Sequence, residues 1–361
     1  MFVPRTAGLI LGMLLLTESS SPAMPPKNIQ EKIDEFAKDE PGGVAVAWVD
    51  RQGTTFFETG TFSAADPRKI TPDTQFEIAS ITKVFTSLLL VESERLGRVA
   101  RTDPAAKYLL PAGDPDQAAL AGITLLSLAT HTSGLPRLPS NLKAHVVNPR
   151  DPYSAYDRSM LVEALRQDGK AAVTGGKREY SNFGAAVLGE ALAAAWGTTY
   201  EEALSEHVLV PLGMKAATLG LAGRPAPADL APGHFNGKEV PSWTQIAFAP
   251  AGALRSSSRE MALFLSACVA RDKGPMGAAI EATLKPQVPA KEIGGQAGLG
   301  WLLVDDPAHP LAWHNGGTAG SHSFIAIDRD TGEGIVILAN FQKASEKLGF
   351  DFFKGRDAVA K

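Results

Sequence analysis

The chain places a serine and a lysine three positions apart, at Ser80 and Lys83, and this pair could perform nucleophilic chemistry. A serine hydroxyl attacks a carbonyl efficiently only when a neighbouring base takes its proton. Side chains three residues apart in a helix project on the same side. An amine bordered by apolar residues is partly desolvated, which lowers its pKa and lets it accept that proton. The spacing therefore predicts a serine nucleophile with a lysine base.

A helix is expected to begin near Ser80 and to position both side chains. Its first turn carries free backbone N–H groups and the positive end of the helix dipole, which favour a developing anion. The apolar side chains that would bury one face of this helix follow at helical spacing: Ile81, Val84, Phe85, Leu88 and Leu89.

Ser-x-x-Lys alone is a weak signal, because the chain holds a second copy at Ser140 and Lys143. That copy lies among prolines and has no apolar stripe behind it, so we interpret it as a loop. For the first copy, the competing interpretation is a helix-capping serine beside a solvated lysine.

Two further motifs add polar groups at distant points of the chain. Tyr180 and Asn182 form the only Tyr-x-Asn motif, which directly precedes a predicted helix. His314 and Gly316 form the only His-x-Gly motif, followed by Gly317, at the end of a predicted strand. Taken singly, these motifs are also compatible with a helix N-terminal turn and with a glycine-rich hairpin.

The order and spacing of the three motifs resemble the serine β-lactamase and penicillin-binding superfamily, whose Ser-x-x-Lys signature supplies the nucleophile. The resemblance is strongest to the class C β-lactamase branch with its esterase, carboxypeptidase and D-aminopeptidase relatives. Residues 131–136, 211–214 and 250–254 also resemble landmarks of this branch. The similarity covers about residues 30–340.

The resemblance implies that Ser80 attacks a carbonyl carbon and forms an acyl-enzyme. Lys83 and Tyr180 would share the work of taking its proton and passing it to the leaving group. Tyr180 would then activate the water that hydrolyses the acyl-enzyme. Nearby cations, Lys83 above all, would favour the phenolate that this step needs.

The resemblance also implies how the substrate is held. The backbone N–H groups of Ser80 and Gly317 would form the oxyanion hole. A glycine at position 317 would let the strand approach the substrate closely, beside Gly316. Asn182 would hydrogen-bond Lys83 and the amide carbonyl of the substrate.

The departure from the family pattern is His314. Class C β-lactamases usually carry Lys-Thr-Gly on this strand, where the lysine gives the β-lactam carboxylate a fixed positive charge. A histidine near its reference pKa of about 6.5 is mostly neutral at pH 7. A class C-like β-lactamase is therefore expected first, with an esterase or a D-amino-acid peptidase or carboxypeptidase as the alternative. A non-catalytic β-lactam sensor or structural relative is the alternative from another class.

Composition excludes several other functions. The net charge of −4 and the absence of a Lys/Arg-rich run argue against a nucleic-acid partner. The single cysteine, Cys268, is expected to be a buried small hydrophobe. No Gly-x-Ser-x-Gly elbow is present, which argues against a Ser-His-Asp α/β-hydrolase. The seven histidines are scattered, which argues against a zinc hydrolase, and no metal or other cofactor is expected. His131 and His322 are expected to be structural residues, with a position lining the cleft as the alternative for His322. Nothing in the sequence indicates an oligomeric state.

The first residues resemble a secretory signal, with a short positive start, an apolar run at 7–16 and small residues near position 23. We therefore expect a signal peptide over 1–23 and an exported protein, periplasmic or secreted. The apolar run is shorter than the roughly 20 residues that span a bilayer, so no membrane anchor is expected.

Strand patterns lie at both ends of the chain and helical patterns lie mainly between them. We predict an α/β (α+β) fold with an antiparallel sheet flanked by helices, built from both chain ends, and a mainly helical inserted domain. The sheet-containing domain would cover 24–79 and 240–361, the helical domain 80–239, with the active-site cleft between them. Predicted strands are 44–49, 54–61, 300–304, 311–314, 323–328 and 334–340; predicted helices include 28–38, 160–166, 183–196, 200–208 and 259–269, with a further one from 344.

Overall fold

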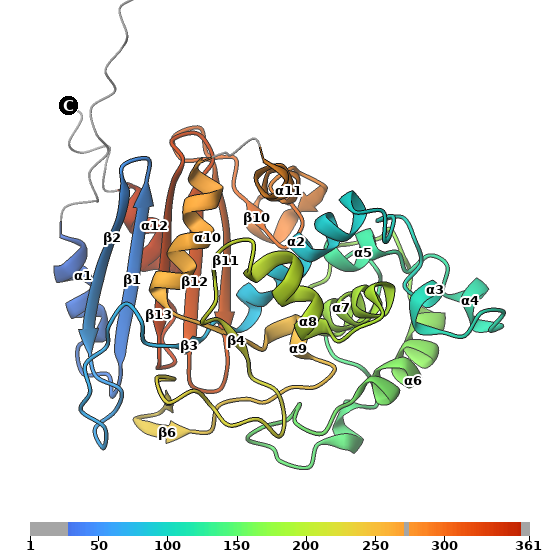
Figure 1. Ribbon diagram of the computed structural model, residues 1–361, viewed down its shortest axis with the longest axis horizontal. Coiled ribbons are helices and arrows are strands. Elements are labelled where there is room, and N and C mark those ends of the chain that lie inside the picture. The colour runs from blue at the N-terminus through green and yellow to red at the C-terminus, as the bar shows by residue number, and fades with distance from the viewer. Residues whose placement is uncertain (1–27, 271–273, 355–361) are drawn as a thin grey trace, which may run out of the picture.

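An eight-stranded sheet in the order β2-β1-β13-β12-β11-β10-β9-β8 forms the centre of one half of the molecule (Figure 1). The computed structural model describes residues 28–270 and 274–354, so the expected signal peptide lies outside the described residues. All neighbouring strands are antiparallel. The strands are β1 (Gly43–Asp50), β2 (Gly53–Gly60), β8 (Val288–Ala290), β9 (Gly295–Ala297), β10 (Leu302–Leu303), β11 (Leu311–Gly317), β12 (His322–Asp328) and β13 (Glu333–Ala339).

Both ends of the chain contribute to this sheet, as predicted, because β1 pairs with β13. Strand side chains alternate between the two faces, so each face has its own core. Ala45 and Ala47 of β1 face the core shared with the central helices, and Val46 and Trp48 face the opposite core. Helix α10 covers the first face, while α1 and α12 cover the second. These helices are α1 (Ile29–Ala37), α10 (Ser258–Ala270) and α12 (Glu346–Lys354).

All six predicted strands are present, but the edge of the sheet differs from the prediction. The strand expected over 300–304 is reduced to the two residues of β10, and the short strands β8 and β9 beyond it were not predicted. These edge strands have two or three residues each, too few to show an alternating pattern. β11 continues three residues past the predicted end, through Gly317.

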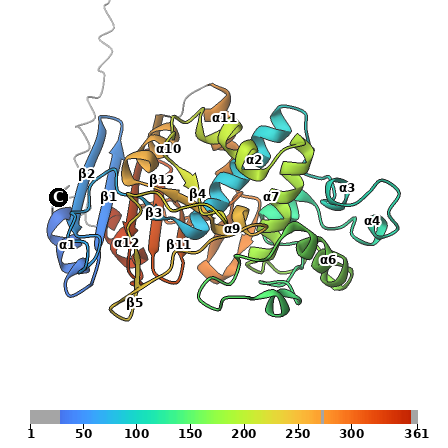
Figure 2. The same cartoon turned by 60° about the horizontal axis from the view of Figure 1, so that its bottom comes forward.

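Helix α2 (Thr82–Arg95) lies at the centre of the helical half, in contact with α7, α9 and α11 (Figure 2). The predicted apolar stripe is buried. The polar side chains of Thr82, Thr86 and Ser87 are buried as well, so the helix has no solvated face along most of its length. Thr86 meets its hydrogen-bonding needs through the carbonyl of Pro250 and the hydroxyl of Tyr200. Lys83 is therefore more completely desolvated than an amphipathic helix would make it.

The predicted helical stretches are present, with one difference at the segment that begins at Tyr200. Five further helices were not predicted, at 106–109, 116–119, 125–129, 249–252 and 275–283. A capping box at Thr199 starts α8, but the helix changes to a wider π-helical turn over Ser205–Leu209. Within the described residues, no helix has both the length and the apolar character to cross a membrane. The helices are α3 (Ala106–Leu109), α4 (Asp116–Ala119), α5 (Leu125–Ala129), α6 (Arg158–Asp168), α7 (Asn182–Trp196), α8 (Tyr200–Leu204), α9 (Ala249–Gly252) and α11 (Pro275–Thr283).

A small three-stranded sheet connects the two halves next to Ser80. Its order is β3-β7-β4, and β3 is the strand that leads directly into the Ser80 turn. The backbone N–H of Ile78 continues this pairing by donating to the carbonyl of Leu254 at 3.0 Å. The start of α2 is thereby fixed to the strand that follows α9. The strands are β3 (Phe76–Glu77), β4 (Thr218–Leu219) and β7 (Leu254–Ser256).

Candidate active site

Ser80 lies in a tight turn, the 3₁₀ helix Ala79–Ile81, immediately before α2. Ala79 has a left-handed backbone with φ of +48°. Such a conformation costs a residue with a side chain of order 1–3 kcal/mol and is found most often at functional sites. The hydroxyl of Thr82 donates to the Ala79 carbonyl at 2.7 Å and helps to hold this backbone. The turn presents Ser80 half-buried rather than enclosed.

The structure brings the three predicted catalytic side chains into direct contact. The Lys83 ammonium donates to Ser80 Oγ at 3.1 Å, and the Tyr180 hydroxyl donates to the same oxygen at 2.7 Å. Lys83 Nζ also donates to the carbonyl of Ala251, at 2.6 Å, which orients the amine from the α9 side. One hydroxyl thus meets two groups able to exchange a proton with it.

Burial decides the protonation behaviour of Lys83. Its side chain is buried in the centre of the molecule, and this desolvation lowers the pKa of Lys83. Tyr180 opposes the shift, since the Lys83 ammonium lies 4.9 Å from the centre of the Tyr180 ring. A lysine with a lowered pKa has a larger neutral fraction near pH 7, which is the form that accepts a proton.

His131 positions Tyr180 and does not contact Ser80. Its carbonyl accepts from the N–H of Glu179 at 2.8 Å, its Nδ1 accepts from the N–H of Ser181 at 3.2 Å, and its ring lies 4.7 Å from the Tyr180 ring. Burial lowers the pKa of His131 well below its usual value, which keeps the ring neutral and Nδ1 free to accept. The expectation that His131 is a structural residue agrees with these contacts.

Asn182 differs from the prediction. Its side chain was expected to bond Lys83, but its buried carboxamide oxygen has no hydrogen-bond partner. The ammonium of Lys83 is instead directed to Ser80 and Ala251. A buried acceptor without a partner costs free energy, so this oxygen is available to a group that enters the site.

The close approach of β11 to the turn that carries the nucleophile occurs at Gly316. The role predicted for Gly317, a close approach of the strand to the substrate, concerns a bound substrate and stays a prediction. A Cβ at position 316 would lie 2.3 Å from the carbonyl oxygen of Ile78 and 3.0 Å from the backbone nitrogen of Ser80. At Gly317 the nearest atom to such a Cβ, the Gln342 amide nitrogen, is 3.8 Å away. Gly316 therefore lets the strand lie against the Ser80 turn, while exposed Gly317 lines the pocket.

His314 is buried on β11, and its Nδ1 lies 2.6 Å from the carbonyl oxygen of Asn315. Burial lowers the pKa of His314 to about 3, with the nearby Lys83 acting in the same direction. The ring is therefore neutral at all physiological pH values, and Nδ1 must carry the proton that it donates to the carbonyl. The strand supplies no positive charge at this position.

The sequence of this chain is similar to those of known proteins. A family model described as Beta-lactamase matches residues 29–359. The chain belongs to the β-lactamase family. A protein named D-alanyl-D-alanine-carboxypeptidase/endopeptidase AmpH from Escherichia coli K12 is 30% identical over 218 residues, which cover 59% of this chain and 56% of that protein, little more than half its length.

Two other similarities extend over more of the chain. A protein named Beta-lactamase from Escherichia coli K12 is 25% identical over 376 residues, covering 91% of this chain and 93% of that one. The solved structure of a class C β-lactamase from Rhodobacter sphaeroides superposes with a TM-score of 0.77 at 21% identity, covering 92% and 99% of the two chains. At this identity the structural match shows the fold, and it confirms the predicted fold class.

In this member of the β-lactamase family, the pocket beside Ser80 includes residues that the motifs did not predict. They come from the 135–156 segment, from the segment before α9 and from the end of β11, which pack together only in the folded chain. No motif in the 135–156 segment had indicated this role. The added lining residues are Tyr153, Trp243, Gln245, Phe248 and Thr318.

Buried Glu77 connects three parts of this pocket. Its carboxylate accepts from the Trp243 backbone N–H at 2.7 Å and from the Thr318 hydroxyl at 2.8 Å. Burial raises the pKa of Glu77, while Thr318 and the neighbouring Arg255 lower it. Glu77 thus connects β3 to β11 and to the segment before α9, and this role could not be read from local sequence.

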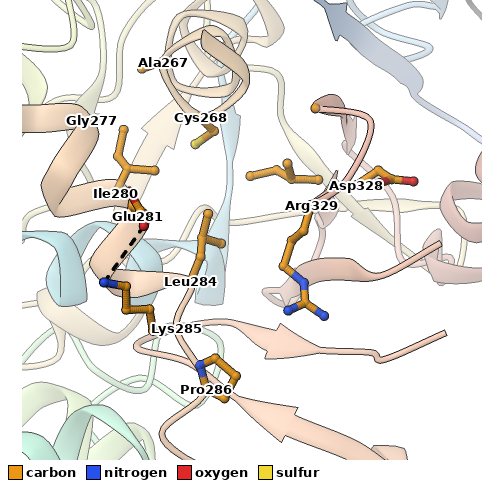
Figure 3. Close-up of a pocket in the computed structure, with 12 residues that line it drawn as sticks. Ala267, Cys268, Gly277, Ile280, Glu281, Leu284, Lys285, Pro286, Asp328 and Arg329 are labelled. Carbon is orange, nitrogen blue, oxygen red and sulfur yellow. Dashed lines mark ion pairs between the residues drawn. The ribbon is translucent and has the colours of Figure 1, made fainter. Parts of the chain in front are cut away.

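A separate cavity of about 380 Å³ lies between α10, α11 and the end of β12 (Figure 3). Cys268 lines it, and burial raises the pKa of its thiol, so the thiol stays protonated. The expectation that Cys268 is buried is confirmed. No residue of the Ser80 pocket lines this cavity.

The remaining sequence candidates do not join the site. His322 is buried with Nδ1 3.1 Å from the Ser345 hydroxyl and Nε2 3.6 Å from the Glu346 carboxylate. In the second Ser-x-x-Lys copy, the Ser140 hydroxyl donates to Asp168 at 2.6 Å. Over 28–270 and 274–354, no group of three or more histidine, cysteine or acidic residues could hold a metal ion.

Proposed function

We propose that this protein is a serine hydrolase that acts on an amide or ester carbonyl through an acyl-enzyme on Ser80. The observation that carries the proposal is the pair of hydrogen bonds from Lys83 and Tyr180 to one half-buried serine hydroxyl. Neutral Lys83 takes the hydroxyl proton as Ser80 attacks, and Tyr180 passes a proton to the leaving group. Water then hydrolyses the acyl-enzyme with Tyr180 as its base.

The binding groups are proposed from the same geometry. The backbone N–H groups of Ser80 and Gly317 form the oxyanion hole, and Gly316 allows the strand to lie close enough for this. The unpaired carboxamide oxygen of Asn182 accepts an N–H from the substrate. His314, being neutral, contributes shape and hydrogen bonding rather than charge.

The first substrate class that we propose is a β-lactam, as in the relatives named Beta-lactamase. The alternative is a D-amino-acid peptide or an ester, and the similarity to a named D-alanyl-D-alanine carboxypeptidase/endopeptidase favours the peptide. We further propose export through a signal peptide over 1–23, and a cleft formed between a sheet-containing domain (24–79 and 240–361) and a helical domain (80–239).

Replacing the nucleophile tests the proposal. Ser80→Ala should abolish covalent labelling by a fluorescent penicillin and hydrolysis of a chromogenic cephalosporin, p-nitrophenyl esters and D-amino-acid peptides. Ser140→Ala is the matched control, because Ser140 belongs to the second Ser-x-x-Lys copy and its hydroxyl donates to Asp168, away from the Ser80 pocket. Labelling of Ser80→Ala at the wild-type rate would remove Ser80 from the mechanism.

The same assays separate an enzyme from a sensor. Steady turnover of any substrate in the panel supports a hydrolase, whereas a single stoichiometric burst with no further product would indicate a non-catalytic β-lactam sensor. If the wild-type protein is neither labelled by the penicillin nor turns over any substrate in the panel, the interpretation that remains is a structural relative.

A further inference from the structure

The site as described has no free positive charge on the sheet side. His314 is neutral and donates its one proton to the carbonyl of Asn315. The Lys83 ammonium is buried and directed to Ser80 and the Ala251 carbonyl. A substrate that carries a carboxylate therefore needs its counter-charge from another element of the cleft.

Arg137 is positioned to supply that charge from the helical side. Its guanidinium lies 5.1 Å from the centre of the Tyr180 ring, and its side chain is exposed to solvent. Its backbone carbonyl accepts from the N–H groups of Asn182 at 3.0 Å and Phe183 at 3.2 Å, so the residue is fixed to the start of α7. Arg137 thus lies beside the ring whose hydroxyl donates to Ser80 Oγ.

The guanidinium of the neighbouring Arg178 is engaged in an ion pair, and that of Arg137 is not. Arg178 forms an ion pair with Glu292 and is largely buried. Within the described residues, no carboxylate forms an ion pair with Arg137. Its positive field nevertheless reaches the site, since it contributes to the lowered pKa of Lys83 and opposes the rise in the pKa of Tyr153.

We propose that Arg137 is the carboxylate-binding residue of this enzyme, so that its preferred substrates are amides or esters bearing an anionic group beside the reacting carbonyl. The inference rests on the proposed function. A guanidinium presents paired N–H donors that match the two oxygens of a carboxylate, which a neutral imidazole cannot do. The charge that relatives are expected to carry on the β11 strand is here on the loop that follows α5 and packs against the start of α7.

The test compares Arg137→Gln with wild type on two pairs of substrates that differ in charge alone. One pair is a penicillin and its carboxylate methyl ester; the other is a p-nitrophenyl ester with a terminal carboxylate and its neutral carboxamide. The variant should lower kcat/KM for the carboxylate member relative to the neutral member by about tenfold or more, the scale of one charge-assisted hydrogen bond. Most of the loss should be in KM, and Arg137→Lys should retain part of the preference.

Lys177→Gln is the matched control, since it removes one exposed positive charge from a groove that Tyr180 also lines and Arg137 does not. It should leave the ratio unchanged. Raised salt should reduce the carboxylate preference of wild type and not that of Arg137→Gln.

Three results would overturn the inference. The first is an unchanged ratio of kcat/KM between the carboxylate and neutral members in Arg137→Gln. The second is an equal loss of kcat/KM on both members of each pair, which would show that Arg137 only positions Tyr180. The third is a shift of this ratio in Lys177→Gln instead. If wild type is acylated by neither pair, the proposed function fails and this inference fails with it. If wild type is acylated and the ratio does not move, the proposed function stands and only the role of Arg137 is lost.

Discussion

At the scale of single residues, burial sets the charge state of the groups around Ser80. Lys83 and His314 are both buried, and burial disfavours the charged form of each, so both have lowered pKa values. For Lys83 the result is a base that can take a proton from Ser80. For His314 the result is a ring that stays neutral and cannot replace a lysine as a binding site for anions.

The lowered pKa of His314 makes a prediction about stability and pH. The folded protein holds this ring neutral down to about pH 3, while the unfolded chain protonates it near its usual value of 6.5. The unfolded state therefore binds more protons between these values, and folding stability falls as the pH drops below 6.5. The contribution is about 1.4 kcal/mol per pH unit, or roughly 2 kcal/mol between pH 6.5 and 5.

His314→Gln removes this contribution. The difference in unfolding free energy between wild type and variant, measured by urea titration at several pH values, should be constant above pH 7. Below pH 6.5 it should change steadily in favour of the variant. A difference that stays constant down to pH 5 would show that His314 is protonated in the folded protein.

The sequence could predict Ser80, Lys83 and Tyr180 because each belongs to a short motif with its own helical or turn context. It could not predict the unpaired oxygen of Asn182 or the place of Arg137, since both depend on how the start of α7 packs against a loop more than forty positions earlier. Contacts of this kind are set by tertiary structure and leave no local pattern.

At the scale of elements, the site depends on how closely β11 lies against the turn that carries Ser80. The hydroxyl of Ser323 on the neighbouring strand donates to the carbonyl of Ile78 at 2.8 Å, which joins β12 to the same turn. Gly316 lies opposite Ser323 in the β11–β12 pairing. The turn is thus held by two adjacent strands, and any side chain at position 316 would separate them.

Gly316→Ala tests this packing. The added Cβ would collide with the backbone of Ile78 and Ser80, which cannot rotate away, so the strand or the turn must move. We expect a loss of about 1–3 kcal/mol in stability, typical of overpacking, together with a large fall in acylation rate. Differential scanning calorimetry and penicillin labelling measure the two effects.

Gly317→Ala is the matched control for stability. A Cβ there has no neighbour closer than 3.8 Å, so the thermal midpoint should stay near that of wild type. Equal thermal midpoints for the two variants would mean that β11 tolerates a side chain against the Ser80 turn. The sequence could predict the strand β11 from its alternating residues. It could not predict which of the two glycines must be a glycine, because that depends on the atoms that lie opposite each one.

At the scale of the whole molecule, the sheet forms only when the two ends of the chain meet. β1 pairs with β13 over six residue pairs, and β13 is followed by a fully buried asparagine, Asn340. Strand patterns at both ends of the sequence were sufficient to predict this closure. The side chain that connects the ends was not predicted, since Asn340 was expected only as the last residue of the strand 334–340 and a strand pattern does not show what its side chain bonds.

Asn340→Ala should destabilise the whole fold. Its carboxamide oxygen accepts from the Gly43 N–H at 2.7 Å, and its nitrogen donates to the carbonyls of Phe62 and Pro232, each at 2.8 Å. Truncation leaves two buried backbone groups and one partly buried group without this partner, at about 1–3 kcal/mol for each buried group, so we expect a loss of at least about 2 kcal/mol. Urea unfolding should show a lower midpoint with an unchanged slope. Asn148→Ala, which removes a single exposed bond to the backbone of Arg150, should shift the midpoint far less, and equal shifts would show that the two chain ends are held together without Asn340.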